Sequence, residues 1–598
     1  MDVFGLLTMI GGLAMFLYGM KTMGDGLEKL SGGRLEKILE KLTSKRILAV
    51  LLGAVVTGAI QSSSAATVMV VGFVNSGIMK LSQAAGIIMG ANIGTTVTSW
   101  LLSLTGIESS NLFLKMLKPS SFAPILALIG IILLMGSKST KKKDIGVILL
   151  GFTVLMYGME TMSGAVKPLA ENEAFTGILV KFTNPVLGVL TGLLLTAAIQ
   201  SSSASVGILQ ALCVTGSVSY GLAVPVIMGQ NIGTCVTALL SSVGSSKNAR
   251  RASMIHLYFN LIGTAVFLIG FYVLNWMVDG FSFLNEAANA GGIAVIHSLF
   301  NVGAVLLLYP FADHLVHLAE ITVRDHDKQE PEEEADIFSR LDTRFLDRPD
   351  FALEISKEVT EKMALETQSA LRLAIKNRTS FSDVTVTEVI QRENTIDRYE
   401  DRIGSYIMQV KGKSISDHGK KTLAILEHCI GNFERISDHA VNLTETAEAV
   451  EQKNLHFSEA ALAEIALYEQ AIDAIMEMTV QAFIHMDLDL ARNIEPLEQV
   501  IDDLNSRIKR HHLKRLREGS CAIELGVYIE DLLTNMERIA DHCSNIGIGL
   551  LRIHEDKLDT HKYLDDMKDS PDDTYLTKYM EYKKTYALPK QLQLTGGV

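Results

Sequence analysis

Two long stretches of this 598-residue chain carry no acidic side chain. Residues 41–107 and 174–278 contain no Asp or Glu, and residues 47–79 contain no Lys or Arg either. Charged side chains are costly inside a lipid bilayer, and carboxylates are common proton carriers there. The absences therefore predict bilayer segments whose binding site consists of neutral dipoles, and they exclude a carboxylate proton relay within both of these stretches.

Cysteine and clustered positive charge are also scarce. Residues 1–320 carry 19 Lys+Arg and 14 Asp+Glu, whereas residues 321–598 carry 35 and 53. The first part is typical of a membrane protein and the second of a soluble one. The acidic second part argues against nucleic acid as a partner, because phosphate backbones are bound by clustered Lys and Arg. The five cysteines have no metal-binding spacing and predict no disulfide framework.

One block of sequence occurs twice, with an offset of 139 residues. The tetrapeptide Gln61-Ser62-Ser63-Ser64 recurs as Gln200-Ser201-Ser202-Ser203, and we call each copy a QSSS motif. In the same register, residues 90–96 recur as 229–235 and residues 18–20 recur as 157–159. Duplicated membrane units with polar, helix-breaking centres are typical of secondary transporters, whose site lies at the interface between the repeats.

The apolar segments predict seven helical crossings and two hairpins. The crossings are expected near residues 3–23, 83–106, 120–136, 145–163, 222–243, 252–275 and 291–311, each close to the roughly 20 residues that a bilayer needs. Residues 47–79 and 185–218 are too long for one crossing and too short for two. Each is interrupted by a QSSS motif and predicts a hairpin that enters the membrane and returns.

The positive charges predict a topology. Short loops rich in Lys and Arg stay in the cytoplasm, and such loops occur at residues 29–46, 138–143 and 247–251. They share one side only if both hairpins are re-entrant. The prediction is a multi-pass protein of the cytoplasmic membrane with its N-terminus outside and its second half in the cytoplasm. Three crossings per repeat invert the second copy, so the two hairpin tips should meet near the midplane.

Such tips suit an oxyanion beside a cation. Exposed helix N-termini offer N–H groups, broken C-termini offer carbonyls, and serine hydroxyls serve both ions. Neutral oxygens suit sodium. The repeated Asn-Ile-Gly-Thr stretches add further candidate ligands: Asn92, Thr95, Thr96, Asn231 and Thr234, with Thr98 and Thr237 one turn later. The alternative is that these small polar residues promote close helix packing and bond to their own backbone.

A pair of His-x-x-Phe-Asn sequences predicts contacts between helices. His256 and Asn260, like His297 and Asn301, are four residues apart and share one helix face. We expect hydrogen bonds to neighbouring helices here rather than substrate contact.

At the two QSSS motifs, the chain resembles the sodium-phosphate cotransporter family, the bacterial relatives of the type II sodium-dependent phosphate transporters. The resemblance covers about residues 1–311 and implies sodium-driven uptake of inorganic phosphate, with sodium as the coupling ion. It implies phosphate ligands at Gln61, Ser62, Ser63, Ser64, Gln200, Ser201, Ser202, Ser203, Asn92 and Asn231. By the same resemblance, Gln61, Ser64, Thr234 and Thr237 are the best candidates for sodium. Ser203, Thr95 and Thr96 are further sodium candidates because of their place in the repeated polar stretches. Cys235 stands where repeat one has Thr96, so the two halves are not expected to coordinate identically.

Residues 345–555 show apolar positions at helical spacing and predict an antiparallel helical bundle, after an acidic linker at 321–344 and before a polar tail at 556–598 without assigned function. This region is also duplicated, because Glu434 and Asp438 recur as Glu537 and Asp541. A second pair, Glu393 and Asp397, recurs as Glu498 and Asp502. Carboxylates four residues apart lie on one helix face. They predict either a cation site or a solvated acidic face.

The second part resembles PhoU, a phosphate-signalling protein of two three-helix bundles whose acidic motifs bind metal clusters. The resemblance implies divalent, iron or zinc ions at the eight carboxylates just named, and phosphate-signalling proteins or a second copy of the chain as partners. The overall expectation is an all-α polytopic membrane protein of two inverted repeats (about 3–136 and 145–275) plus an extra span and a cytoplasmic bundle pair. We expect no enzymatic activity. Two alternatives stay open: a transporter of sulfate or a dicarboxylate, and a membrane receptor that reports phosphate occupancy.

Overall fold

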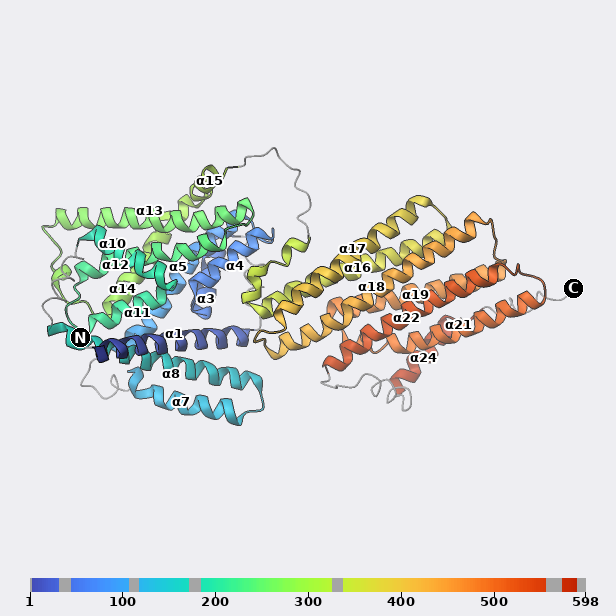
Figure 1. Cartoon of the computed structure of the whole chain (residues 1–598), viewed down its shortest axis with the longest axis horizontal. Helices are drawn as coiled ribbons and strands as arrows, with labels where there is room; N and C mark the ends of the chain where they lie inside the picture. Colours follow the sequence, from blue (N-terminus) through green and yellow to red (C-terminus); the bar gives the residue numbers. More distant parts are fainter. Residues whose placement is uncertain are drawn as a thin grey trace. The chain divides into compact units, whose positions relative to one another are not determined.

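The computed structural model describes residues 3–31, 45–106, 118–171, 184–324, 337–554 and 573–588. These residues are almost entirely helical, with a single isolated β-bridge and no strand among them, which confirms the predicted all-α class (Figure 1). The chain forms two compact units, Met1–Phe351 and Ala352–Val598. Arg34, Lys37 and Lys41 of the first predicted positive loop lie outside the described residues, as do much of the linker and of the tail.

Six helices of the described residues are long and apolar enough to cross a membrane. The predicted span at 120–136 is also a helix, but a shorter one, α7 (Pro119–Gly136). The six are α1 (Val3–Ser31), α5 (Leu81–Ser103), α8 (Thr140–Val166), α12 (Tyr220–Ser241), α13 (Lys247–Met277) and α14 (Ala290–Leu308), which the short α15 (Ala312–Thr322) follows.

Each predicted hairpin is a pair of short helices. The first pair is α3 (Arg46–Ile60) and α4 (Ser63–Asn75), and the second is α10 (Pro185–Ile199) and α11 (Ser202–Cys213). The break falls at the glutamine of each QSSS motif, which adopts a left-handed conformation with φ of 59° at Gln61 and 57° at Gln200. Left-handed residues commonly end helices, and here each one lets a new helix start within two residues.

The duplication extends to the packing of the helices. α3 packs on α5, and α10 packs on α12. A Cβ atom at Gly90 would lie 2.0 Å from the Val50 carbonyl oxygen, and one at Gly229 would lie 1.9 Å from that of Val189. Only glycine permits these approaches, because any other residue would place its Cβ inside a neighbouring backbone. Both pairs obey the 139-residue offset.

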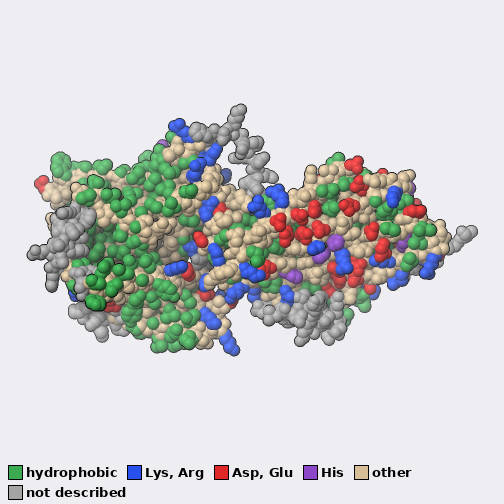
Figure 2. All heavy atoms as spheres, in the orientation of Figure 1, with side chains coloured by type: hydrophobic (Ala, Val, Ile, Leu, Met, Phe, Trp, Pro, Cys, Tyr) green, Lys and Arg blue, Asp and Glu red, His purple; other side chains and the backbone are tan. Residues whose placement is uncertain are grey.

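The surface of the first unit is rich in exposed apolar side chains. Figure 2 shows hydrophobic side chains over most of its visible face, whereas acidic and basic side chains cover much of the second unit. Phe4, Val55 and Leu128 are more than half exposed. A continuous apolar surface of this extent marks contact with lipid or protein, and together with the six apolar helices it identifies a membrane protein.

Within the described residues, six long helices form the second unit, and the first of them begins just before it. Three come from the first half of this region, namely α16 (Pro349–Thr379), α17 (Asp383–Val410) and α18 (Asp417–Gln452). Three come from the second half: α19 (Glu459–His485), α21 (Ile494–Arg517) after the short α20 (Leu488–Ala491), and α22 (Leu525–His554). In the tail, α24 (Asp573–Thr585) packs on α21, where Tyr575 donates a hydrogen bond to Gln499 Oε1 at 2.6 Å. The sequence had not predicted this helix.

Candidate functional site

The two QSSS motifs line one cavity of about 260 Å³ in the first unit. They are 139 residues apart in the chain and meet because each hairpin breaks at its own motif. The remaining lining residues are Met20, Lys21, Gly24, Asp25, Ile60 and Arg348. The structure thus brings together all eight QSSS residues that the sequence proposed as phosphate ligands.

Two helices begin at this cavity. α4 starts at Ser63 and α11 starts at Ser202. The first N–H groups of a helix have no partner within it and carry partial positive charge. In each motif the first serine caps only one of them: Ser62 Oγ accepts from Ala65 N, and Ser201 Oγ accepts from Ala204 N, both at 3.2 Å. Two helix N-termini with serine hydroxyls form an environment that favours an oxyanion.

The glutamines of the two motifs have different surroundings. Gln61 is 8% exposed, and its Oε1 accepts a hydrogen bond from Thr98 Oγ1 at 2.8 Å. Its amide nitrogen donates to the Gly58 carbonyl oxygen. Gln200 is exposed. A threonine of repeat two also serves repeat one, because Thr237 Oγ1 donates to Ser64 Oγ at 3.4 Å. Neutral oxygens therefore gather around the first motif more than around the second.

Six of the other predicted ligands do not line the cavity as the structure describes it. Five of them bond to carbonyl oxygens of their own helices, as the alternative interpretation expected: Asn92 to Ile88 at 3.0 Å, Thr95 to Ala91 at 3.0 Å, Thr96 to Ile93 at 2.7 Å, Thr234 to Asn231 at 2.5 Å and Thr237 to Thr234 at 3.1 Å. Asn231 donates to Asn301 Oδ1 at 2.6 Å. Among the six, Thr237 also reaches the first motif, through its longer contact with Ser64 Oγ.

The prediction of a site made of neutral dipoles alone is wrong for this cavity. Lys21 and Asp25 of α1 and Arg348 beyond the linker lie in its lining. The hairpins do lack acidic side chains, as the sequence shows, but the charged residues of the cavity come from other segments. Lys21 follows the repeated Tyr-Gly-Met directly and could have been considered on that ground. No pattern in the sequence marks Arg348.

The two asparagines of the His-x-x-Phe-Asn sequences bond across helices, as predicted, but the histidines do not support the prediction. Within the described residues, neither ring nitrogen of His297 has a hydrogen-bond partner, nor does Nδ1 of His256. Asn260 on α13 donates to Cys235 Sγ on α12 at 3.4 Å. Asn301 on α14 accepts from Asn231 on α12. These hydrogen bonds fix α12, the helix that follows the second hairpin, to both α13 and α14.

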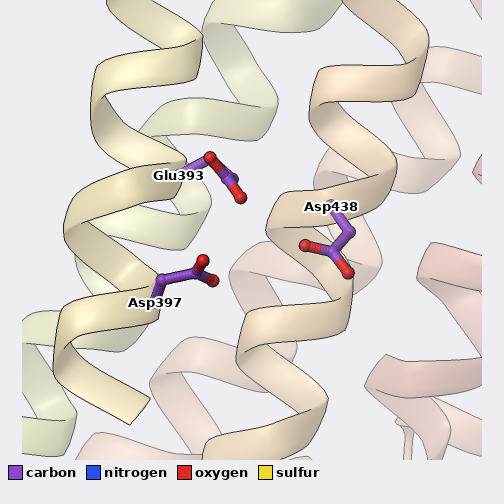
Figure 3. Close-up of side chains that lie close together, drawn as sticks. All are labelled: Glu393, Asp397 and Asp438. Atoms are coloured by element: carbon purple, nitrogen blue, oxygen red, sulfur yellow. The ribbon is translucent and has the colours of Figure 1, made fainter. Parts of the chain in front are cut away.

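The second unit contains two clusters of three carboxylates. In the first, Glu393 and Asp397 of α17 face Asp438 of α18 (Figure 3), with ligand atoms within 4.8 Å of one another. The second is its duplicate and consists of Glu498, Asp502 and Asp541. The remaining two predicted ligands, Glu434 and Glu537, belong to neither group of three. Glu537 Oε2 instead accepts a hydrogen bond from Asn505 Nδ2 at 2.5 Å.

The clusters hold unfavourable negative charge. Burial and then the neighbouring carboxylates raise the pKa values of Glu393 and Asp397. Burial, followed by Asp438, raises the pKa of Glu434 to about 7. Burial also raises the pKa of Asp541. A hard cation fits this donor set, because carboxylate oxygens are its preferred ligands and its charge would offset the repulsion.

Duplicated membrane units around one polar cavity define the architecture of a secondary transporter. Comparison with known protein families supports this architecture. The Na+/Pi-cotransporter family matches twice, over residues 15–164 and 154–296, and the PhoU domain matches over residues 360–447 and 466–548. The chain belongs to the Na+/Pi-cotransporter family and carries a PhoU domain.

Several proteins are similar to this chain. YjbB of Escherichia coli (strain K12), named "Putative inorganic phosphate export protein", is 24% identical over 91% of this chain and 97% of its own length. The "Phosphate-specific transport system accessory protein PhoU homolog 1" of Thermotoga maritima is 24% identical over 34% of this chain and 88% of its own length. The rat "Sodium-dependent phosphate transport protein 2A" is 34% identical over 16% of this chain and 15% of its own length. No solved structure matches.

Proposed function

We propose that this protein is a sodium-coupled symporter of inorganic phosphate with a cytoplasmic regulatory PhoU domain. The observation that carries the proposal is the single cavity shared by both QSSS motifs, at which two helix N-termini begin. Phosphate would lie between the motifs, bound by the serine hydroxyls and the N–H groups. The family match and the names of the relatives support phosphate as the substrate.

Sodium would bind on the side of the first motif. Gln61 Oε1, Ser64 Oγ and the hydroxyls of Thr98 and Thr237 supply neutral oxygens there, and two hydrogen bonds already connect them in pairs. In this arrangement the cation would bring Gln61 and Ser64 into the geometry that the anion needs. The coupling would then be reciprocal, because two ligands that favour one conformation raise each other's affinity.

The direction of net transport would follow the gradients. With sodium higher outside, coupled movement imports phosphate, which is our proposal for the normal state of the cell. Net export, the activity in the name of YjbB, would require an outward phosphate gradient that exceeds the sodium gradient. Alternating access would arise from inverted repeats that move against each other around the QSSS motifs, with the N-terminus outside.

The PhoU domain would adjust flux from the cytoplasm. Its two carboxylate clusters would bind hard metal ions through Glu393, Asp397 and Asp438, and through Glu498, Asp502 and Asp541. A bound cation would neutralise the facing helices of each bundle and fix their spacing. Loss of the ion would loosen the domain, and this would be the signal that reaches the transporter.

The proposal is tested by phosphate flux in proteoliposomes that contain the purified full chain. Labelled phosphate outside, with an inward sodium gradient, should accumulate above its equilibrium level. The matched control replaces sodium by potassium at the same ionic strength and should abolish accumulation. Sodium-independent flux, or equal flux of sulfate or a dicarboxylate in place of phosphate, would contradict the proposal.

A second arm separates import from export. Vesicles are loaded with phosphate, and the sodium gradient is reversed. A symporter whose direction is set by gradients should now release phosphate at a comparable rate. Release that needs no sodium, together with no uptake in the first arm, would instead identify an exporter. A chain that binds phosphate but moves none in either arm would fit the receptor alternative.

A further inference from the structure

A segment outside both repeats completes the cavity. Residues 337–351, here called the strap, lie between the linker and the PhoU domain. They contain two short 3-10 turns, Ile337–Arg340 and Thr343–Asp347, and then enter α16. Arg348, near the end of the strap, lines the cavity together with both QSSS motifs. All of these residues belong to the first unit.

The strap is seated on the membrane part by apolar contacts. Phe345 and Phe351 are each 1% exposed. Their ring centroids lie 5.4 and 5.3 Å from that of Phe73 on α4. A Cβ atom at Gly72 would lie 2.7 Å from Phe345 Cε1, so the glycine provides the space for this ring. The equivalent residue of repeat two is Ala211.

Polar contacts fix the strap further. Asn75 at the end of α4 donates to Asp342 Oδ2 at 2.8 Å, while its Oδ1 accepts from Ser246 N at 2.8 Å. Arg344 pairs with Asp342 at 2.5 Å and donates to Ser245 Oγ at 2.6 Å. Repeat two has Val214 where repeat one has Asn75, so this seat is a property of repeat one.

The charges in the cavity lining are Lys21, Asp25 and Arg348. Lys21 and Asp25 are four residues apart on α1, a spacing at which opposite charges offset each other. Arg348 places a second positively charged side chain, beside Lys21, in the cavity lining. Its planar guanidinium presents paired donors that match the oxygens of a phosphate.

We propose that the strap supplies Arg348 as a charged ligand for the oxyanion in the QSSS cavity, so that the substrate site is completed by the segment that leads into the PhoU domain. The inference rests on the proposed function, because it assigns phosphate to this cavity. It makes Arg348 a specificity determinant that favours anions. It also gives the PhoU domain a direct covalent route to the site, since the strap continues into α16.

The test measures phosphate binding by calorimetry and phosphate flux in proteoliposomes, with the full chain at saturating sodium. Arg348→Gln should raise the KM and the Kd for inorganic phosphate by about 10-fold while kcat stays nearly unchanged. Arg348→Lys, which keeps the charge but not the paired donors, should give an intermediate KM. Arg324→Gln is the matched control, since Arg324 is exposed and lies outside both the strap and the cavity lining, and it should behave as wild type.

Gly72→Ala provides an independent variant. It leaves every lining residue intact but should displace Phe345 and with it the strap, so the KM for phosphate should rise as in Arg348→Gln. An unchanged KM in Arg348→Gln, beside active wild type, would overturn this inference alone. A wild-type chain that neither binds nor moves phosphate would overturn the proposed function, and the inference with it.

Discussion

The two repeats share a sequence motif and a backbone but not a chemical environment. Gln61 and Gln200 occupy the same left-handed position with nearly equal φ. Gln61 is buried and bonded to Thr98, whereas Gln200 is exposed. Repeat one also receives Thr237 from repeat two, and its Gly72 and Asn75 contact the strap, whereas repeat two has Ala211 and Val214 at these positions. The cavity therefore has two walls of similar backbone, one formed by each QSSS motif and the helix that begins there. The wall of the first motif has more polar partners than the wall of the second.

This difference suggests a division of labour. Both walls present a helix N-terminus and serines, so both should contribute to phosphate binding. Only the first wall gathers several neutral oxygens, so it should dominate sodium binding. The following changes test that division, from the largest expected effect to the smallest.

The largest effect is expected from the glutamines. Gln61→Ala removes a proposed sodium ligand and leaves the buried Thr98 hydroxyl without its acceptor, so sodium-coupled uptake should fall by about 100-fold. Gln200→Ala should reduce uptake by less than about 10-fold. The pair is well matched, because alanine meets the same positive φ at both positions. Equal losses in initial rates of labelled phosphate uptake would refute the asymmetry.

The serines should respond alike. Ser63→Ala and Ser202→Ala each remove one hydroxyl from the cavity and no packing group, so each should weaken phosphate affinity by about 10-fold. The melting temperature of the purified protein should stay unchanged. Phosphate titrations at fixed sodium measure the effect. Normal affinity in both variants would count against a shared site.

The PhoU domain extends the comparison to a second duplication. The pKa of Glu434 is raised to about 7 from an ordinary value of 4.5, so the folded state holds its proton more tightly than the unfolded state. Stability should therefore fall as pH rises from about 4.5 to about 7. Glu434→Gln should flatten this part of the profile of melting temperature against pH.

Divalent cations should restore the stability that the PhoU domain loses as pH rises. At pH 8, addition of Mg²⁺ or Mn²⁺ should raise the melting temperature of the full chain by binding the folded carboxylates. The double variant Asp397→Asn and Asp438→Asn serves as the control and should respond less. A melting temperature that rises with pH through this window, with or without Glu434, would contradict the assignment of the raised pKa.

The smallest effect is expected from restoring symmetry at one position. Cys235→Thr gives repeat two the residue that repeat one carries at Thr96. The new hydroxyl can donate to the Asn231 carbonyl oxygen, which the thiol already approaches at 3.7 Å. Uptake should remain within about two-fold of wild type. A large change in the sodium dependence of uptake would show that this position shapes coordination.

Much of this architecture could be predicted from the sequence because it is local and repeated. The apolar runs specify the helices, and the QSSS motif interrupts each hairpin at the residue where the structure breaks. The offset of 139 residues revealed the duplication, and the three crossings expected per repeat predicted that the two motifs would meet. The carboxylate spacing likewise brought six of eight predicted ligands into two clusters.

The charged part of the cavity could not be predicted in this way. Arg348 reaches it only because Phe345 and Asp342 fix a nonlocal segment to α4, and no periodic pattern encodes such a contact. The hydrogen bonds of Asn92, Thr95, Thr96 and Thr234 to their own helices were equally hidden, since the same residue types serve as ligands or as backbone partners. Their role depends on which face of the helix meets the cavity.

The most direct test of the shared cavity is the affinity of the purified full chain for inorganic phosphate, measured by calorimetry at several sodium concentrations. The account predicts that sodium tightens phosphate binding, that phosphate tightens sodium binding by the same factor, and that the Ser63→Ala, Ser202→Ala double variant loses both effects. An affinity for phosphate that is identical in sodium and in potassium would contradict it.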